Sequence, residues 1–361
     1  MKILHTESSG GWGGQEIRIL TESQVFFDHG HEVIIAADKD SQIAKKAFEF
    51  GVKVRPIRLS KKRWGDFKAL RSLIIKENPD VISCHSSTDH WLAALARLTI
   101  KNSPAIVRTR HISTAVHRNW PTKWLYSEGA EAIMTTGISI RSHLIEDHFV
   151  DSTKVFSIPT GIDLNRFAPG NQKQQRKKLG LPQNHFIFGI VATLRSWKGH
   201  ADLIEAFDKL EQPEVSLIIV GDGPQMDACR AMASKTKYPQ NIYFFGNQND
   251  VVPYLQAIDS FVLPSYANEG VPQALLQAMA VGVPVITCAI GGIPESIKNY
   301  SNKTVVATRN PKLLSLSMKE AILQKSEGRV RRKRLTEHSL DSMYESVLKV
   351  YKSAIQQSIC G

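Results

Sequence analysis

The sequence predicts an α/β protein of two domains, each built on a parallel sheet. Short apolar runs alternate with helical patterns through the first half, and the same alternation restarts near residue 186. Strands that alternate with helices are typical of parallel sheets covered by helices. With 361 residues, the chain is also long enough for two domains of average size.

The first half opens with a βαβ pattern. We expect a strand over Lys2 to Thr6, a glycine-rich turn, a helix over Gln15 to Asp28 and a strand over Glu32 to Ala37. Later strands are expected over residues 52–59, 80–84, 105–108, 132–135 and 155–158. His85 follows one of these strands, and we interpret it as a structural histidine.

The second half repeats this pattern. Strands are expected over residues 186–192, 215–220, 241–245 and 286–288, and a helix over 201–210. The polar stretch from Gly170 to Lys178 is predicted to be a linker beside the domain boundary. The predicted domains are residues 1–168 and 169–339, followed by a closing helix within 340–361.

The stretch from Phe261 to Pro284 predicts a strand, an acidic loop and a helix. Pro272 suits the first helical position, and Gly282 suits the position after the helix end. The helix N-terminus, which favours anions, would then lie beside Glu269. The Glu269 carboxylate could accept hydrogen bonds from sugar hydroxyls while backbone amides hold phosphate, which is what a nucleotide sugar requires. A surface acid before an ordinary buried helix is the alternative interpretation.

This stretch resembles the donor-site signature of retaining glycosyltransferases of family 4, the group 1 enzymes. Pro264-Ser265, Glu269-Gly270-Val271-Pro272 and Ala278 to Val285 match that signature, whereas Gln277 stands where the family has a second glutamate. The resemblance implies two facing Rossmann-like domains of the GT-B type with a cleft between them. It also implies that the closing helix crosses back to the N-terminal domain. Gln277 can still bind ribose hydroxyls, because an amide both donates and accepts.

The resemblance also implies roles for individual residues. Glu269 and His111 are the expected catalytic residues. Position alone, and not the resemblance, makes Arg108 and Arg110 the expected acceptor-binding residues, because both lie where a strand ends. The expected donor-binding residues are Arg195, Lys198, Gly270, Val271, Gln277, Gly13, Gly14, Gly223 and Asn247. No metal or other cofactor is expected, because Arg195, Lys198 and the helix amides would stabilise the charge on the leaving phosphate.

Composition indicates where in the cell the protein is expected. Four scattered cysteines predict free thiols, and no apolar run approaches the length of a membrane span or signal peptide, so we expect a cytoplasmic protein. The net charge of +12 is shared between the halves, and two basic stretches contain tryptophan, Lys61 to Trp64 and His117 to Trp124. Such stretches suit peripheral contact with an anionic inner membrane surface.

These features together predict a transferase that moves a sugar from a nucleotide-diphosphate sugar, with UDP as the expected nucleotide, to a glycan. The expected acceptor is lipopolysaccharide or a lipid-linked saccharide in a bacterium. Two alternatives stay open, a nucleotide-sugar 2-epimerase and a non-catalytic binder of anionic lipid or nucleotide. Nucleic acid is not an expected partner, because the basic residues form no repeated reading element.

Overall fold

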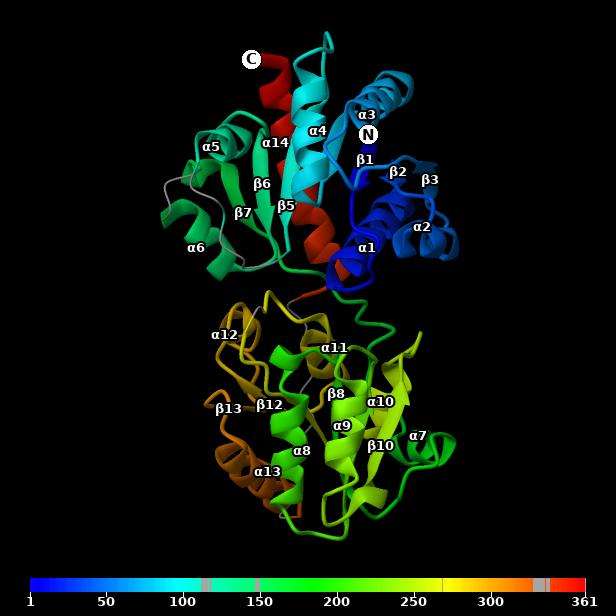
Figure 1. The fold of residues 1–361 in the computed structure, drawn as a ribbon, viewed down its shortest axis with the longest axis vertical. Coiled ribbons are helices and arrows are strands. Elements are labelled where there is room, and N and C mark those ends of the chain that lie inside the picture. Colours follow the sequence, from blue (N-terminus) through cyan, green and yellow to red (C-terminus); the bar gives the residue numbers. More distant parts are fainter. Residues whose placement is uncertain are drawn as a thin grey trace. The chain divides into compact units, whose positions relative to one another are not determined.

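The structure is a computed structural model that describes residues 1–111, 116, 119–146, 150–267, 269–326, 335 and 338–360. These residues divide into two units (Figure 1). The N-terminal unit contains residues 1–161 and the segment from Ser339 onward, and the C-terminal unit is Ile162–His338. The first division therefore falls at Gly161 and not at residue 168.

The N-terminal unit is built on a parallel sheet. Seven strands of the described chain form it in the order β3-β2-β1-β4-β5-β6-β7. They are β1 (Lys2–Glu7), β2 (Glu32–Ala37), β3 (Lys53–Pro56), β4 (Val81–Cys84), β5 (Ala105–Arg110), β6 (Ala132–Thr135) and β7 (Val155–Ser157). The inner strands are rich in buried apolar residues, as expected where helices cover both faces of a sheet, whereas the edge strand β3 has no buried residue.

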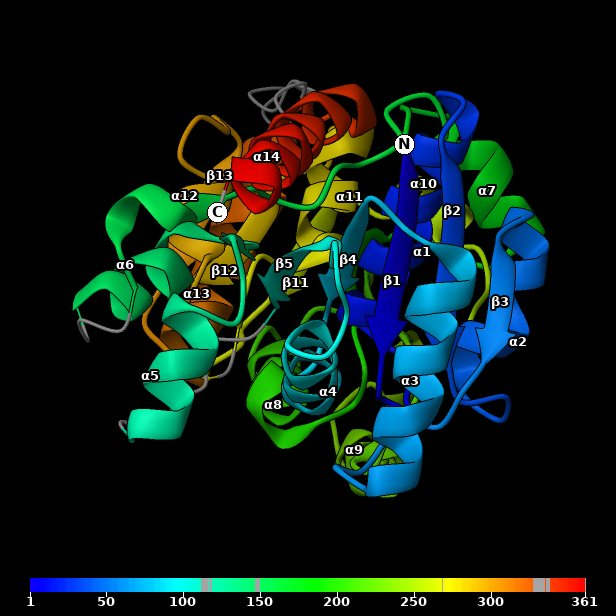
Figure 2. The ribbon, with the colours of Figure 1, turned by 90° about the horizontal axis from the view of Figure 1, so that it is seen from above.

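Successive residues of these strands enter two different core layers. Ile3 packs in one layer and Leu4 in the other, because neighbouring side chains of a strand point to opposite faces. Figure 2 shows α14 on one side of β1, β4 and β5, and α3 and α4 on the other. The helices of this unit are α1 (Gly14–Asp28), α2 (Gln42–Ala47), α3 (Trp64–Glu77), α4 (Ser87–Arg97), α5 (Trp120–Ser127), α6 (Ile138–Glu146) and α14 (Leu340–Cys360).

The closing helix α14 is part of the N-terminal core. Its buried residues Val347 and Tyr351 pack in the same layer as Ile3 and Phe26. The last helix of the chain therefore stabilises the first domain.

The C-terminal unit contains a second parallel sheet with the order β10-β9-β8-β11-β12-β13. Its strands are β8 (Phe186–Val191), β9 (Val215–Val220), β10 (Ile242–Gly246), β11 (Ser260–Leu263), β12 (Val285–Cys288) and β13 (Lys303–Val306). Its helices are α7 (Gln172–Lys178), α8 (His200–Asp208), α9 (Met226–Ala233), α10 (Val252–Ala257), α11 (Gln273–Val281), α12 (Ile293–Ser296) and α13 (Pro311–Ser326).

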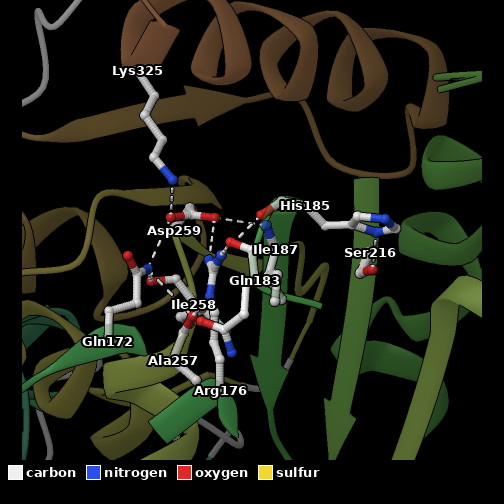
Figure 3. Close-up of polar contacts among 10 residues, drawn as sticks. All are labelled: Gln172, Arg176, Gln183, His185, Ile187, Ser216, Ala257, Ile258, Asp259 and Lys325. Atoms are coloured by element: carbon white, nitrogen blue, oxygen red, sulfur yellow. Dashed lines mark hydrogen bonds and ion pairs between the residues drawn. The ribbon is translucent and has the colours of Figure 1, made fainter. Parts of the chain in front are cut away.

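The predicted linker at 170–178 was wrong, because most of it forms α7. A buried ion pair explains why a polar segment folds against this unit (Figure 3). Arg176 Nη2 lies 2.6 Å from Asp259 Oδ2, and these side chains are 4% and 2% exposed. Asp259 also accepts hydrogen bonds from the Ile187 backbone and from Gln172, and it pairs with Lys325 of α13. One carboxylate thus joins α7, α13 and the start of β8.

Candidate functional site

The central feature of the C-terminal unit is an ion pair at the point where strand order reverses. The chain runs outward from β8 through β9 to β10 and then returns to β11 on the other side of β8. Ligands of open α/β sheets bind at the carboxyl ends of strands at such a switch point. Here Lys198, which follows β8, donates a hydrogen bond of 2.6 Å to Oε1 of Glu269, which follows β11. The Glu269 side chain is 4% exposed and that of Lys198 is 21% exposed.

Close backbone packing holds the Glu269 loop in place. Gly291 has φ +54°, and a Cβ there would lie 1.9 Å from the Glu269 carbonyl oxygen. The Gly292 backbone donates a hydrogen bond of 3.1 Å to the Gly270 carbonyl. The turn after β12 therefore fixes the loop that carries the acid, and glycine is required for this approach.

A second loop packs against the other side. Gly199 has φ +76°, and its Cβ would meet the Pro264 carbonyl oxygen at 2.3 Å. The Tyr266 backbone also donates a hydrogen bond of 2.9 Å to Trp197. These contacts bring the loop of Lys198 against the loop of Glu269.

The helix after this loop follows the sequence prediction closely. α11 ends at Val281 with Gly282 in the left-handed conformation, but Pro272 is its N-cap and Gln273 its first residue. Leu275 and Met279 are fully buried, whereas Gln277 is partly exposed.

The other expected donor residues of this unit lie in loops at the same sheet edge. Arg195 is exposed, and its guanidinium lies 5.3 Å from the centre of the Trp197 ring. Gly223 follows β9 and packs against the Leu194 backbone. Asn247 follows β10 and is exposed.

The N-terminal sheet has its own switch point between β1 and β4. Glu7 ends β1, and Ser86 follows β4 and caps α4. Ser86 Oγ donates a hydrogen bond of 2.6 Å to Glu7 Oε1, and the Ser9 backbone donates to the same oxygen at 2.7 Å. Gln15 donates to the other carboxylate oxygen. A buried carboxyl group thus bridges the two strands.

Burial and charge repulsion make this carboxyl group unusual. Burial, together with the nearby Asp89 carboxylate, raises the pKa of Glu7 to about 7. Burial also raises the pKa of Asp89, although Arg108 acts in the opposite direction. Arg108 is itself buried, with Nε and Nη1 lacking a hydrogen-bond partner among the described residues.

The other expected residues of this unit lie around the same edge. Gly13 is the N-cap of α1 and Gly14 its first residue, with the buried acid Glu16 in the first turn. Arg110 ends β5 and donates a hydrogen bond of 2.7 Å to the Tyr126 hydroxyl. His111 is the next residue and is partly exposed.

Sequence reasoning missed Glu7 and Asp89. One signal was available, because Ser86 and Asp89 form a capping box at the start of α4. His85 was interpreted as structural. It is buried, but it contacts His111 directly, with 3.0 Å between its Nδ1 and His111 Nε2.

Comparisons with known proteins agree with this architecture. Residues 12–166 match the family described as Glycosyltransferase Family 4, and residues 171–339 match Glycosyl transferases group 1. The UDP-Gal:alpha-D-GlcNAc-diphosphoundecaprenol alpha-1,3-galactosyltransferase of Escherichia coli is 31% identical over 252 residues, which are 65% of this chain and 65% of that protein. The chain thus matches slightly less than two thirds of this relative's length.

Solved structures show the same fold over almost the whole chain. A glycosyltransferase from Rickettsia africae superposes with a TM-score of 0.87 at 20% identity, covering 98% of both chains. Anabaena HepE, solved with UDP and glucose, superposes with a TM-score of 0.82 at 17% identity, covering 98% of this chain and 100% of HepE. With two Rossmann-like domains of the GT-B type and family matches to both, the chain belongs to the group 1 glycosyltransferases of the family 4 type.

Proposed function

We propose that this chain is a retaining, metal-independent glycosyltransferase that uses a UDP-sugar. The Lys198–Glu269 pair at the switch point of the C-terminal sheet carries this proposal. It sets a cation and a hydroxyl-binding carboxylate side by side, and both are needed for a nucleotide-diphosphate sugar. UDP is favoured because the E. coli relative is named for UDP-Gal and HepE was solved with UDP.

In this proposal the C-terminal residues stabilise the leaving diphosphate. Arg195 and Lys198 supply positive charge, and the backbone amides of Gly270 and Val271, in the loop just before α11, can donate hydrogen bonds to phosphate oxygens. These groups would take the place of a metal ion. Glu269 orients the sugar by accepting hydrogen bonds from its hydroxyls.

Retention follows from attack on the side of the leaving group. The acceptor oxygen forms the new bond to the anomeric carbon while the bond to the phosphate oxygen breaks, and the acceptor proton passes to that phosphate oxygen. No separate nucleophile is required. His111, at the carboxyl edge of the N-terminal sheet, would contact the sugar or the acceptor.

We further propose that the acceptor is carried by a lipid. The two basic tryptophan stretches meet through Trp91, because Lys62 Nζ lies 5.0 Å from the centre of the Trp91 ring and that ring stacks on Trp124. Trp64 is 70% exposed and Trp120 is 77% exposed. We define the tryptophan surface as Lys61, Lys62, Arg63, Trp64, Trp91, Trp120 and Trp124. His117 and Arg118 lie outside the described residues.

The tryptophan surface supports the proposal that the protein binds peripherally to the anionic inner face of the plasma membrane. Lysine and arginine attract anionic headgroups, and exposed indoles suit the interface. No helix of the described ranges is long and apolar enough to cross a bilayer. The E. coli relative is named for a diphosphoundecaprenol acceptor, which is consistent with this proposal.

Nucleotide binding is the first test. Thermal unfolding is measured in EDTA with UDP, GDP or ADP, for the wild type and for Glu269→Ala. A ligand at a hundredfold over its Kd adds about 2.7 kcal/mol of stability, so UDP alone should raise the Tm by several degrees. No shift with any nucleotide would contradict the proposal, and conversion of a nucleotide sugar without acceptor would indicate the epimerase.

Membrane binding is tested separately by flotation with vesicles that contain anionic lipid. We expect the wild type to float with the vesicles at low salt and the Trp64→Ala/Trp120→Ala variant to remain unbound in the bottom fraction. Phe48→Ala removes a ring that is 89% exposed outside the tryptophan surface, and it should float like the wild type. If the wild type does not float, soluble acceptors become the better proposal.

A further inference from the structure

Three histidine rings form a continuous hydrogen-bonded row beneath the carboxyl edge of the N-terminal sheet. His85 Nδ1 lies 3.0 Å from His111 Nε2, and His85 Nε2 lies 2.9 Å from His5 Nδ1. His5 belongs to β1, while His85 and His111 directly follow β4 and β5. No group of three His, Cys, Asp or Glu in the parts of the chain described could hold a metal ion. We therefore ask which nitrogen of each ring carries the proton.

The inner end of the row is closed. His5 is 0% exposed and His85 is 1% exposed. Ser83 Oγ lies 3.2 Å from His85 Nε2. The charged groups that act on His5 are Glu22 and Arg18, which pair with each other at 2.9 Å, and Glu22 also accepts a hydrogen bond from Tyr351 of α14.

The surroundings of all three rings favour the neutral imidazole. Burial lowers the pKa of each ring, and for His85 and His111 it lies well below the ordinary value. Arg18 and Arg108 act in the same direction on both of these rings, and Arg110 does so on His111. At His5, the Glu22 carboxylate raises the pKa and Arg18 lowers it, so the two charges act in opposite directions on this ring.

A neutral imidazole carries one N–H, so only two proton orders satisfy both bonds. In the first, His5 donates to His85, His85 donates to His111, and the remaining N–H lies on His111 Nδ1. In the second, all donors point the other way and His5 Nε2 carries a proton. His5 Nε2 is buried and has no hydrogen-bond partner among the described residues. The first order is favoured, because a buried N–H without an acceptor is rarer than a bare acceptor atom.

We propose that His5 and His85 are positioning residues that hold His111 in its Nδ1–H tautomer, so that His111 offers a hydrogen-bond donor to the substrate. The part that concerns substrate rests on the proposed function. In this tautomer His111 stabilises a sugar or phosphate oxygen and does not remove the acceptor's proton. The proton is therefore left to the leaving phosphate.

The tautomer is tested on the protein alone by NMR of ¹⁵N-labelled histidine at pH 7.5. The His111 signals are identified by their loss in His111→Gln. We expect His111 to show a protonated Nδ1 and a bare Nε2. A protonated Nε2 or an imidazolium would overturn the proposal. This result does not depend on turnover, so a failed transferase assay would count against the function and not against the histidine row.

Variants of His85 test the coupling. His85→Asn keeps an N–H donor near the Nδ1 position and should retain the His111 tautomer and most of kcat. His85→Phe removes the donor and should lower kcat by roughly two- to tenfold, the effect of one neutral hydrogen bond, with little change in the KM for donor.

His85→Asp is the decisive variant. It places an acceptor beside His111 Nε2, so His111 should gain a proton there and a new ionisation should appear in the pH profile of kcat. The control is His90→Phe, a buried histidine outside the row, which should leave the His111 tautomer and the pH profile unchanged. Equal tautomers in His85→Asp and the wild type would show that His85 does not position His111.

Discussion

Lys198 and Glu269 form a hydrogen-bonded ion pair of 2.6 Å that spans the switch point between β8 and β11. The two residues are 71 positions apart, and each lies in a loop that a glycine allows to pack closely on its neighbour. Their contact connects the proposed phosphate-binding cation with the proposed sugar-binding carboxylate.

Removal of either partner should impair transfer. The loss of a hydrogen bond to a charged group costs about 1.5–3 kcal/mol, which is roughly ten- to a hundredfold in rate. We expect Glu269→Ala to lower kcat/KM by at least this factor and Lys198→Ala to act mainly through donor binding. Steady-state kinetics with UDP-sugars would measure both. Normal kcat/KM in Glu269→Ala, with the fold intact by circular dichroism, would remove Glu269 from the mechanism.

The glycine that supports the acid should also be essential. In Gly291→Ala the new Cβ would collide with the Glu269 carbonyl oxygen, so the loop must shift and nucleotide-dependent stabilisation should be lost. Gly180→Ala is the matched control, because Gly180 has a similar positive φ of +66° with nothing within 4 Å of its Cβ. Both variants carry the backbone strain, and only Gly291→Ala should lose the UDP-induced rise in Tm. An equal loss in both would assign the effect to strain alone.

Much of the fold could be predicted from sequence because most strands are continuous apolar runs. The expected strands at 32–37, 132–135 and 215–220 have the bounds of β2, β6 and β9. α7 could not be predicted this way. Its buried residue is Arg176, whose partner Asp259 lies 83 positions away, so no apolar periodicity marks the helix.

The candidate site shows the same limit. The loop of Glu269 and the helix after it could be predicted, because one local segment carries strand, acid and helix start. The contact between Glu7 and Ser86 joins residues 79 positions apart, and the contact between His5 and His85 joins residues 80 apart. Both depend on β1 lying beside β4, which periodicity alone does not reveal.

The Asp259 network should dominate the stability of the C-terminal unit. Asp259→Ala leaves the Arg176 guanidinium buried without its counter-ion, and breaking a buried pair in this way costs about 3–5 kcal/mol. Lys325→Ala removes a partner of the same carboxylate whose side chain is 46% exposed, so we expect a loss of about 1 kcal/mol or less. Urea unfolding of both variants would measure the difference. Equal losses would show that Asp259 is stabilised mainly by Lys325 and not by Arg176.

Glu7 should make stability depend on pH in an unusual direction. The pKa of Glu7 is raised from 4.5 to about 7 in the folded protein. Between pH 4.5 and 7, Glu7 is therefore protonated in the folded state and ionised in the unfolded state. Its contribution to the free energy of unfolding is therefore fully present below pH 4.5 and is lost as pH rises through 7. Glu7→Gln should weaken this decline and raise the Tm at pH 8. Asp89, whose pKa is also raised, would account for a decline that remains.

Glu77→Gln provides the opposite case in the same domain. Hydrogen bonds from Arg55 and Lys2 lower the pKa of Glu77 to about 2. The Glu77 carboxylate therefore adds to the free energy of unfolding at pH values above 4.5, its ordinary pKa, and this contribution is lost as the pH falls toward 2. Differential scanning fluorimetry from pH 4.5 to 8.5 should show a lower Tm for Glu77→Gln across the range, and for Glu7→Gln a gain that grows between pH 5 and 8. A gain for Glu7→Gln that does not change with pH would mean that the Glu7 carboxyl does not titrate in this window.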